Sequence, residues 1–182
     1  MITPKRPHEE LDLQERLKEI RLLVIELEGV LTDGTTTCDH QGREAITTRR
    51  ADLWALSQWR DAGNQVVIVA RDDLPAARAW CENHGLTFRP HQGPNKAALM
   101  QTVIFEHELT PPQVCYLGAE LDDLPAMMVA GLSAAPAGAD PWARGAAHLV
   151  LSTPGGAGAV RELVEHILER QHPERKLTPG AD

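Results

Sequence analysis

The amino-acid sequence predicts an α/β fold built on a doubly wound parallel sheet. Short apolar runs, typical of strands buried on both faces, alternate along the chain with longer amphipathic segments. Glycines and other turn residues separate the two kinds of segment. The chain has 182 residues, 42% of them apolar, which is enough for one substantial core. We therefore expect one domain to contain every predicted strand and helix.

The first predicted strand, residues 21–28, follows an amphipathic helix at 9–20 whose leucines recur at near-helical spacing. Two segments rich in β-branched residues, 35–39 and 43–48, then predict a β-hairpin. The other predicted strands are residues 66–69, 86–88, 114–117, 132–134 and 148–151. The other predicted helices are residues 52–62, 74–84, 95–108, 123–130 and 159–171. Trp142 is expected in a loop.

Three parts of the chain are expected to differ in order. Residues 1–20 are interpreted as an N-terminal arm and amphipathic helix, 21–171 as the folded domain, and 172–182 as a flexible tail. The net charge of −8 argues against a nucleic-acid partner, because phosphate binding requires clustered positive charge. Neither a membrane span nor a signal peptide is found, and three scattered cysteines suit reduced thiols, so we expect a cytoplasmic protein.

Ionisable residues follow several of the predicted strands. In parallel sheets, ligands bind beyond the carboxyl ends of the strands. Glu26 and Glu28 lie at the end of the first strand, where two carboxylates suit a divalent cation such as magnesium. Arg71 follows the second buried strand, and Lys96 opens a helix, where an anion would meet a positive charge and free backbone N–H groups.

A further acidic cluster, which includes Glu120, Asp122 and Asp123, follows the strand at 114–117. Acidic residues at the start of a helix are most often caps, which is the simpler interpretation of Asp122 and Asp123. The convergence of these acidic and basic groups at one edge of the sheet favours a functional site instead.

Several of these segments resemble the haloacid dehalogenase-like superfamily, and more narrowly its 3-deoxy-D-manno-octulosonate 8-phosphate phosphatase family. The resemblance covers about residues 21–168. The matching positions are the loop 29–34, Lys96, Gly118, Leu121, Asp123, Leu124, Pro125 and the run 154–162. This resemblance implies a Rossmann-like domain over 21–171 with a β-hairpin insertion and no large cap domain. It also implies a magnesium-dependent phosphatase that forms a homotetramer through the hairpin at 35–48.

The sequence departs from the family pattern at positions that carry the chemistry. Active members have an Asp-x-Asp motif, whose first Asp is the nucleophile and whose second is the general acid/base, at the positions of Glu26 and Glu28. A glutamate extends the carboxylate by one methylene, and a displacement of about 1 Å can cost on the order of a hundredfold in rate. Val69 replaces a phosphate-binding Thr or Ser, and Ala119 replaces a magnesium-binding Asp.

Two hypotheses follow from these departures. In the first, the chain is a catalytically silent or strongly weakened relative that keeps its fold and oligomer for a binding or scaffold role, with a phosphosugar as a candidate ligand. Lys96 and Arg71 are then the candidate phosphate-binding residues, and a metal among Glu26, Glu28, Glu120 and Asp123 is weakly bound or absent. In the second, the chain is an active Mg²⁺-dependent phosphatase of a small phosphorylated sugar acid. Glu26 is then the nucleophile, Glu28 the acid/base and Lys96 the phosphate clamp, and Glu120 replaces the missing metal ligand.

Overall fold

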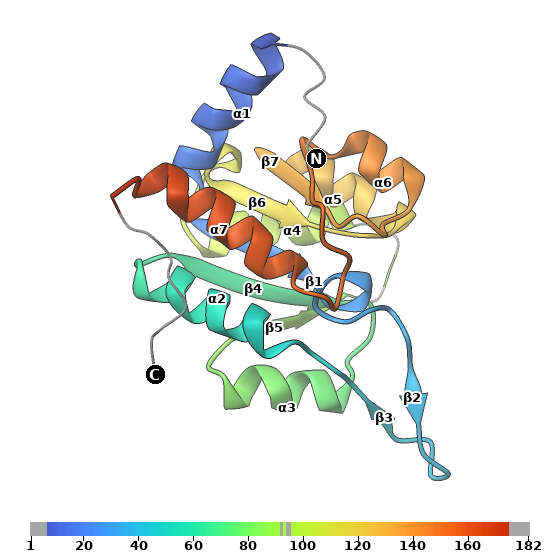
Figure 1. The fold of residues 1–182 in the computed structure, drawn as a ribbon. Helices are drawn as coiled ribbons and strands as arrows, with labels where there is room; N and C mark the ends of the chain where they lie inside the picture. The colour runs from blue at the N-terminus through green and yellow to red at the C-terminus, as the bar shows by residue number, and fades with distance from the viewer. Residues whose placement is uncertain (1–6, 92, 94–95, 175–182) are drawn as a thin grey trace.

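A computed structural model describes residues 7–91, 93 and 96–174 of the chain. Its centre is a six-stranded sheet in the order β5-β4-β1-β6-β7-β8, in which every neighbouring pair is parallel (Figure 1). The strands are β1 (Leu22–Glu26), β4 (Gln65–Ala70), β5 (Thr87–Pro90), β6 (Val114–Leu117), β7 (Leu132–Ala135) and β8 (Leu149–Val150). The predicted parallel α/β sheet is confirmed.

Helices cover both faces of this sheet. On one face, α2 packs against α7. On the other face, α4 packs against α5, which also contacts α6 (Figure 1). The bounds of the helices are α1 (Pro7–Glu19), α2 (Arg50–Asp61), α3 (Pro75–Asn83), α4 (Lys96–Glu106), α5 (Leu124–Val129), α6 (Pro141–Ala146) and α7 (Ala159–Gln171). Within the described part of the chain, every helix is too short or too polar to cross a bilayer.

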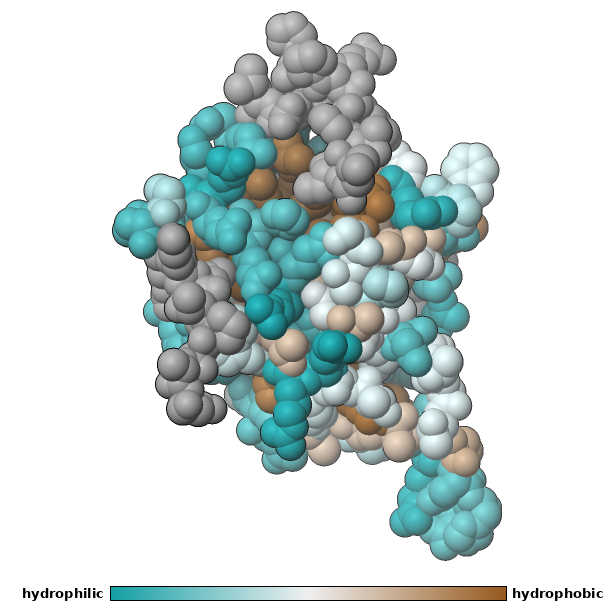
Figure 2. Space-filling view, viewed as in Figure 1, coloured by the Kyte–Doolittle hydropathy of each residue, from teal (hydrophilic) through white to brown (hydrophobic). Residues whose placement is uncertain are grey.

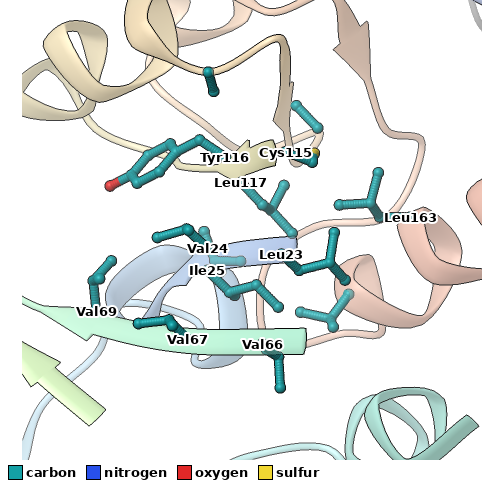
Figure 3. Packing of buried hydrophobic residues seen from close by; sticks show 14 of the residues in the cluster. Leu23, Val24, Ile25, Val66, Val67, Val69, Cys115, Tyr116, Leu117 and Leu163 are labelled. Atoms are coloured by element: carbon teal, nitrogen blue, oxygen red, sulfur yellow. The ribbon is translucent and has the colours of Figure 1, made fainter. Parts of the chain in front are cut away.

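The core lies around β1, because this strand has a neighbour on each side and a helix layer on each face. All five of its residues are buried. Figure 3 shows Leu23 and Ile25 of β1 among Val67 of β4, Leu117 of β6 and Leu163 of α7. This explains why the strand is a nearly continuous apolar run with no polar alternation.

The predicted hairpin is present, but its paired part is short. Only β2 (Thr37–Cys38) and β3 (Glu44–Ala45) form an antiparallel ladder. The turn between them is held by Asp39, whose carboxylate accepts hydrogen bonds from the backbone and side chain of Arg43. The hairpin extends away from the body of the molecule and its far end is hydrophilic (Figures 1 and 2). No core supports the pairing beyond two residues on each strand, so the ladder ends there.

The structure corrects two local predictions. The predicted strand 21–28 ends at Glu26, and a tight turn, η1 (Leu27–Leu31), replaces its last residues. The segment expected to be a loop around Trp142 contains the short helix α6, in which Trp142 is 71% exposed. Asp140 begins this helix by accepting a hydrogen bond from the Trp142 backbone N–H at 2.7 Å. A six-residue helix offers too little periodicity to be recognised from apolar spacing.

Candidate functional site

The candidate site lies at the carboxyl ends of three adjacent strands, β4, β1 and β6. Glu26 is the last residue of β1 and pairs in register with Val69 of β4. Its neighbour Ile25 pairs with Leu117, the last residue of β6. The sheet therefore brings Glu26, Val69 and the loop after Leu117 together, as expected for parallel strands.

The turn after β1 is held in place by glycines from distant parts of the chain. Gly29 has a φ of +72°, and a Cβ atom added there would lie 3.0 Å from the Cβ of Ala119. Gly155 packs so closely on this turn that an added Cβ would lie 1.9 Å from the Gly29 carbonyl oxygen. Gly156 donates a backbone hydrogen bond to the Val30 carbonyl oxygen at 2.9 Å. The glycines near residue 155 thus fix the loop that carries Glu28.

A buried ion-pair cluster occupies the centre of the site. The Lys96 ammonium lies 2.9 Å from Oε2 of Glu26, 2.6 Å from Oδ1 of Asp123 and 3.4 Å from Oδ1 of Asp122. Lys96, Glu26 and Asp123 are 3%, 2% and 0% exposed. Burial alone would lower the pKa of Lys96, but Glu26 and Asp123 raise it above its ordinary value, so the ammonium stays charged.

The hydroxyl of Tyr116 completes this cluster. It lies 3.0 Å from Oε2 of Glu26 and 2.6 Å from Oδ1 of Asp123, and it points out of the apolar residues that surround its ring (Figure 3). A phenol has a single proton, so the Tyr116 hydroxyl shares it between these two acceptors, and the shorter contact is the one to Asp123. Burial and the charge of Asp123 raise the pKa of Glu26 well above its ordinary value, although Lys96 opposes them. Of the two carboxyl groups that contact Tyr116, Glu26 is therefore the weaker acid and Asp123 the stronger.

Asp123 is used to build the loop after β6. Its Oδ2 atom accepts hydrogen bonds from the backbone N–H groups of Ala119 at 2.8 Å and Glu120 at 2.9 Å. An atom added to Gly118 would lie 2.7 Å from the Asp123 side chain, so this loop needs glycine there. Burial would raise the pKa of Asp123, but Lys96 and the Glu120 backbone lower it below its ordinary value. Asp123 is thus ionised and held on both of its oxygen atoms.

The four predicted metal ligands do not form a set that fits magnesium. Glu26 and Asp123 are engaged by Lys96 and Tyr116. Glu28 keeps one buried oxygen, Oε2, without a hydrogen-bond partner among the described residues, and Glu120 is exposed. Across those residues, no group of three or more His, Cys, Asp or Glu side chains could hold a metal ion. Magnesium requires several oxygen ligands in near-octahedral geometry, and this arrangement does not supply them.

The two predicted phosphate-binding residues also contact carboxylates. Arg71 is exposed, and its Nη2 atom lies 3.0 Å from Oδ2 of Asp122. Lys96 is already paired with the carboxylates of the buried cluster. Val69 is buried and brings no hydroxyl group to the site. The structure therefore brings all six predicted site residues to one edge of the sheet, but the two cations face carboxylates.

Tyr116 is the site residue that the sequence alone does not reveal. It lies in the strand run at 114–117, where an aromatic side chain reads as part of the core. A signal was present, however, because a tyrosine in a fully buried strand needs a hydrogen-bond partner for its hydroxyl. The acidic residues after the same strand were the nearest candidates.

Comparisons with known proteins find relatives of this chain among bacterial phosphatases. The 3-deoxy-D-manno-octulosonate 8-phosphate phosphatase KdsC of Haemophilus influenzae is 30% identical over 159 residues, which cover 87% of this chain and 88% of that protein. A solved structure of the cobalt-bound form of the H. influenzae phosphatase has a TM-score of 0.82 and 30% identity, and covers 86% of this chain and 91% of that one. The solved Yersinia pestis phosphatase has a TM-score of 0.84 and 30% identity, with coverage of 88% and 86%. No family model matches the chain.

Proposed function

This chain belongs to the 3-deoxy-D-manno-octulosonate 8-phosphate phosphatase family of the haloacid dehalogenase-like superfamily, and within that family we propose that it is catalytically silent or strongly weakened. Its proposed role is to bind a ligand or to act as a scaffold subunit. The fold is the part that it shares with active relatives. The chemistry of the site is the part in which it departs from them.

The observation that carries this proposal is the buried cluster of Lys96, Glu26, Asp123 and Tyr116. A nucleophilic carboxylate must be ionised and free to approach phosphorus in line with the leaving group. The Oε2 atom of Glu26 is instead held by Lys96 at 2.9 Å and by Tyr116 at 3.0 Å, and burial raises the pKa of this carboxyl group, which disfavours its ionised form. Its extra methylene moves the carboxyl group away from the position that an aspartate would occupy.

The charges around the cluster support the same conclusion. Glu28, Glu120 and Asp122 lie beside it, whereas the cations Lys96 and Arg71 are already paired with carboxylates. A phosphate dianion that approached this edge of the sheet would meet excess negative charge without a neutralising partner. A bound divalent cation would supply that neutralisation in an active phosphatase. The cobalt-bound H. influenzae relative holds such an ion, but the described carboxylates of this chain do not fit one.

The alternative is an active Mg²⁺-dependent phosphatase of a small phosphorylated sugar acid, which the names of the relatives favour. Glu26 would then act as nucleophile, Glu28 as acid/base and Lys96 as phosphate clamp, and Glu120 would take the place of a metal ligand. This function requires Glu26 to be ionised in spite of its raised pKa, and to exchange its contacts with Lys96 and Tyr116 for contacts with substrate. It also requires Glu120 to turn inward from its exposed position.

We further propose that the hairpin at 35–48 mediates assembly into a homotetramer. The paired residues of β2 and β3 are exposed, and the hairpin projects from the body where it can meet other copies (Figure 2). An edge of exposed, unpaired strand backbone is suited to pairing with a neighbouring chain. In this proposal, the protein binds a phosphosugar as a tetramer.

A reversion variant tests the chemical part of the proposal. The resemblance implies Gly-Asp-Asp in active members where this chain has Gly118, Ala119 and Glu120. Together, the substitutions Glu26→Asp, Glu28→Asp, Val69→Thr, Ala119→Asp and Glu120→Asp restore the residue types that the resemblance implies for active members. We expect this variant to gain magnesium-dependent phosphate release on a panel of phosphosugars. The same variant with Lys96→Met is the control for contaminating phosphatase. If the variant with all five substitutions folds but releases no phosphate, these positions do not explain the loss of activity.

A further inference from the structure

Beside α2, on the face of the sheet that also carries α7, lies an open groove of about 310 Å³. Its apolar lining consists of Leu53 and Trp54 from α2 and Leu86, which precedes β5. Arg50 and Arg60, from opposite ends of α2, line it as well. From this arrangement we infer that the groove binds an acidic peptide segment of a partner protein. The inference does not depend on the chemistry of the candidate phosphatase site.

The charge of the groove is opposite to that of the whole protein. The chain carries a net charge of −8, yet the residues that line this groove include two arginines and no carboxylate. Arg60 donates a hydrogen bond to the carbonyl oxygen of His84 at 2.8 Å, which leaves its charge uncompensated. Neither Arg50 nor Arg60 forms an ion pair with any carboxylate of the described residues. Charge complementarity therefore selects an acidic occupant.

The apolar centre of the groove is fixed in place. Trp54 is half-buried, and the Arg161 guanidinium lies 5.5 Å from the centre of its ring. Arg161 is itself held by Glu165 at 2.6 Å. An aromatic ring that is already ordered loses little conformational entropy on binding, and such rings and arginines are enriched in protein interfaces.

The spacing of the two arginines defines the peptide. They are ten residues apart on one helix, which corresponds to about 15 Å along the helix axis. An extended peptide rises about 3.3 Å per residue, so two acidic residues about five positions apart span this distance. The residues between them would lie over Leu53, Trp54 and Leu86, and should be apolar. Recognition of acidic motifs by arginines is a known mode of peptide binding.

The test uses the full chain and a fluorescein-labelled hexapeptide, Glu-Ala-Leu-Leu-Ala-Glu, in a fluorescence anisotropy titration at low salt. We expect saturable binding that weakens as salt is added. Arg50→Glu should weaken binding at least about tenfold, since it replaces attraction by repulsion. Arg144→Glu makes the same change of charge on α6, outside the groove, and should alter the affinity less than about twofold. A hexapeptide with Gln at both ends should not bind.

Three results would overturn the inference. The first is absence of binding to the acidic hexapeptide. The second is an equal loss of affinity in Arg50→Glu and Arg144→Glu, which would show attraction to positive charge in general. The third is a fall in oligomer mass of Arg50→Glu, measured by sedimentation without peptide, which would assign the groove to a second copy of the chain. Circular dichroism of each variant confirms that it is folded.

Discussion

The Nζ atom of Lys96 lies 2.9 Å from the Oε2 atom of Glu26, and less than 5% of either side chain is exposed to solvent. These residues come from the start of α4 and the end of β1, at the edge of the sheet where the candidate site lies. In this chain their contact is part of a closed cluster that also engages Asp123 and Tyr116. The same residues that suggest phosphoryl transfer in the sequence therefore form, in the structure, a stabilising element of the core.

Replacing the lysine tests this stabilising role. Lys96→Met leaves Glu26 and Asp123 buried without their cation, and removal of one partner of a buried ion pair costs about 3–5 kcal/mol. We expect a loss of this size in the free energy of unfolding measured with urea. Lys18→Met is the matched control, because Lys18 pairs with Glu15 at the surface, and it should change the stability little. Equal effects of the two substitutions would contradict the account.

The pH dependence of stability tests the raised pKa of Glu26, which favours a proton on its carboxyl group in the folded protein. Because its pKa is raised by folding, the folded protein holds this proton more tightly than the unfolded chain does. Glu26 should therefore reduce the free energy of unfolding progressively as the pH rises above its ordinary pKa of 4.5. Glu26→Gln imitates the neutral carboxyl group and should gain stability relative to wild type as the pH rises to about 8. If Glu26→Gln is the less stable protein there, Glu26 is ionised in the folded state.

The pKa of Asp123 is shifted in the opposite direction, so its contribution to stability should change with pH in the opposite way. Its pKa is lowered by Lys96 and by backbone hydrogen bonds, in spite of its burial. Its contribution to stability is therefore present above its ordinary pKa of 3.8 and disappears as the pH falls below it. Asp123→Asn should thus be less stable than wild type at neutral pH, with a smaller difference in acid. The two variants together separate the proton on Glu26 from a general effect of changing a carboxylate.

The close contact between Gly155 and Gly29 predicts that a larger residue at position 155 destabilises the fold. Gly155→Ala would place a methyl group 1.9 Å from the Gly29 carbonyl oxygen, so the turn that carries Glu28 must move. We expect a loss of about 3 kcal/mol in the free energy of unfolding, as for other overpacked positions. Gly145→Ala is the control. Gly145 lies in α6, and a Cβ atom added there would meet no other atom within 4 Å. It should keep or slightly raise the stability.

The sequence was sufficient for the sheet because β1, β4 and β6 are apolar runs that only a two-sided environment explains. It was not sufficient for the turn at Leu27–Leu31, whose shape depends on the packing of Gly155 from a distant segment. The convergence of the charged residues followed from the topology of parallel strands. The pairing of Lys96 with Glu26 did not, because the two residues are 70 positions apart in the chain. Tyr116 was missed for a different reason, because it lies in an apolar strand run where an aromatic side chain is expected to belong to the core.

The measurement that tests the central claim most directly is phosphate release by the purified wild-type chain on a panel of phosphosugars, with and without magnesium. Glu26→Gln serves as the control for contaminating phosphatase. We predict that the folded wild-type protein releases no more phosphate than this control. Magnesium-dependent turnover that is lost in Glu26→Gln would contradict it, and would show that a glutamate can act as the nucleophile in this family fold.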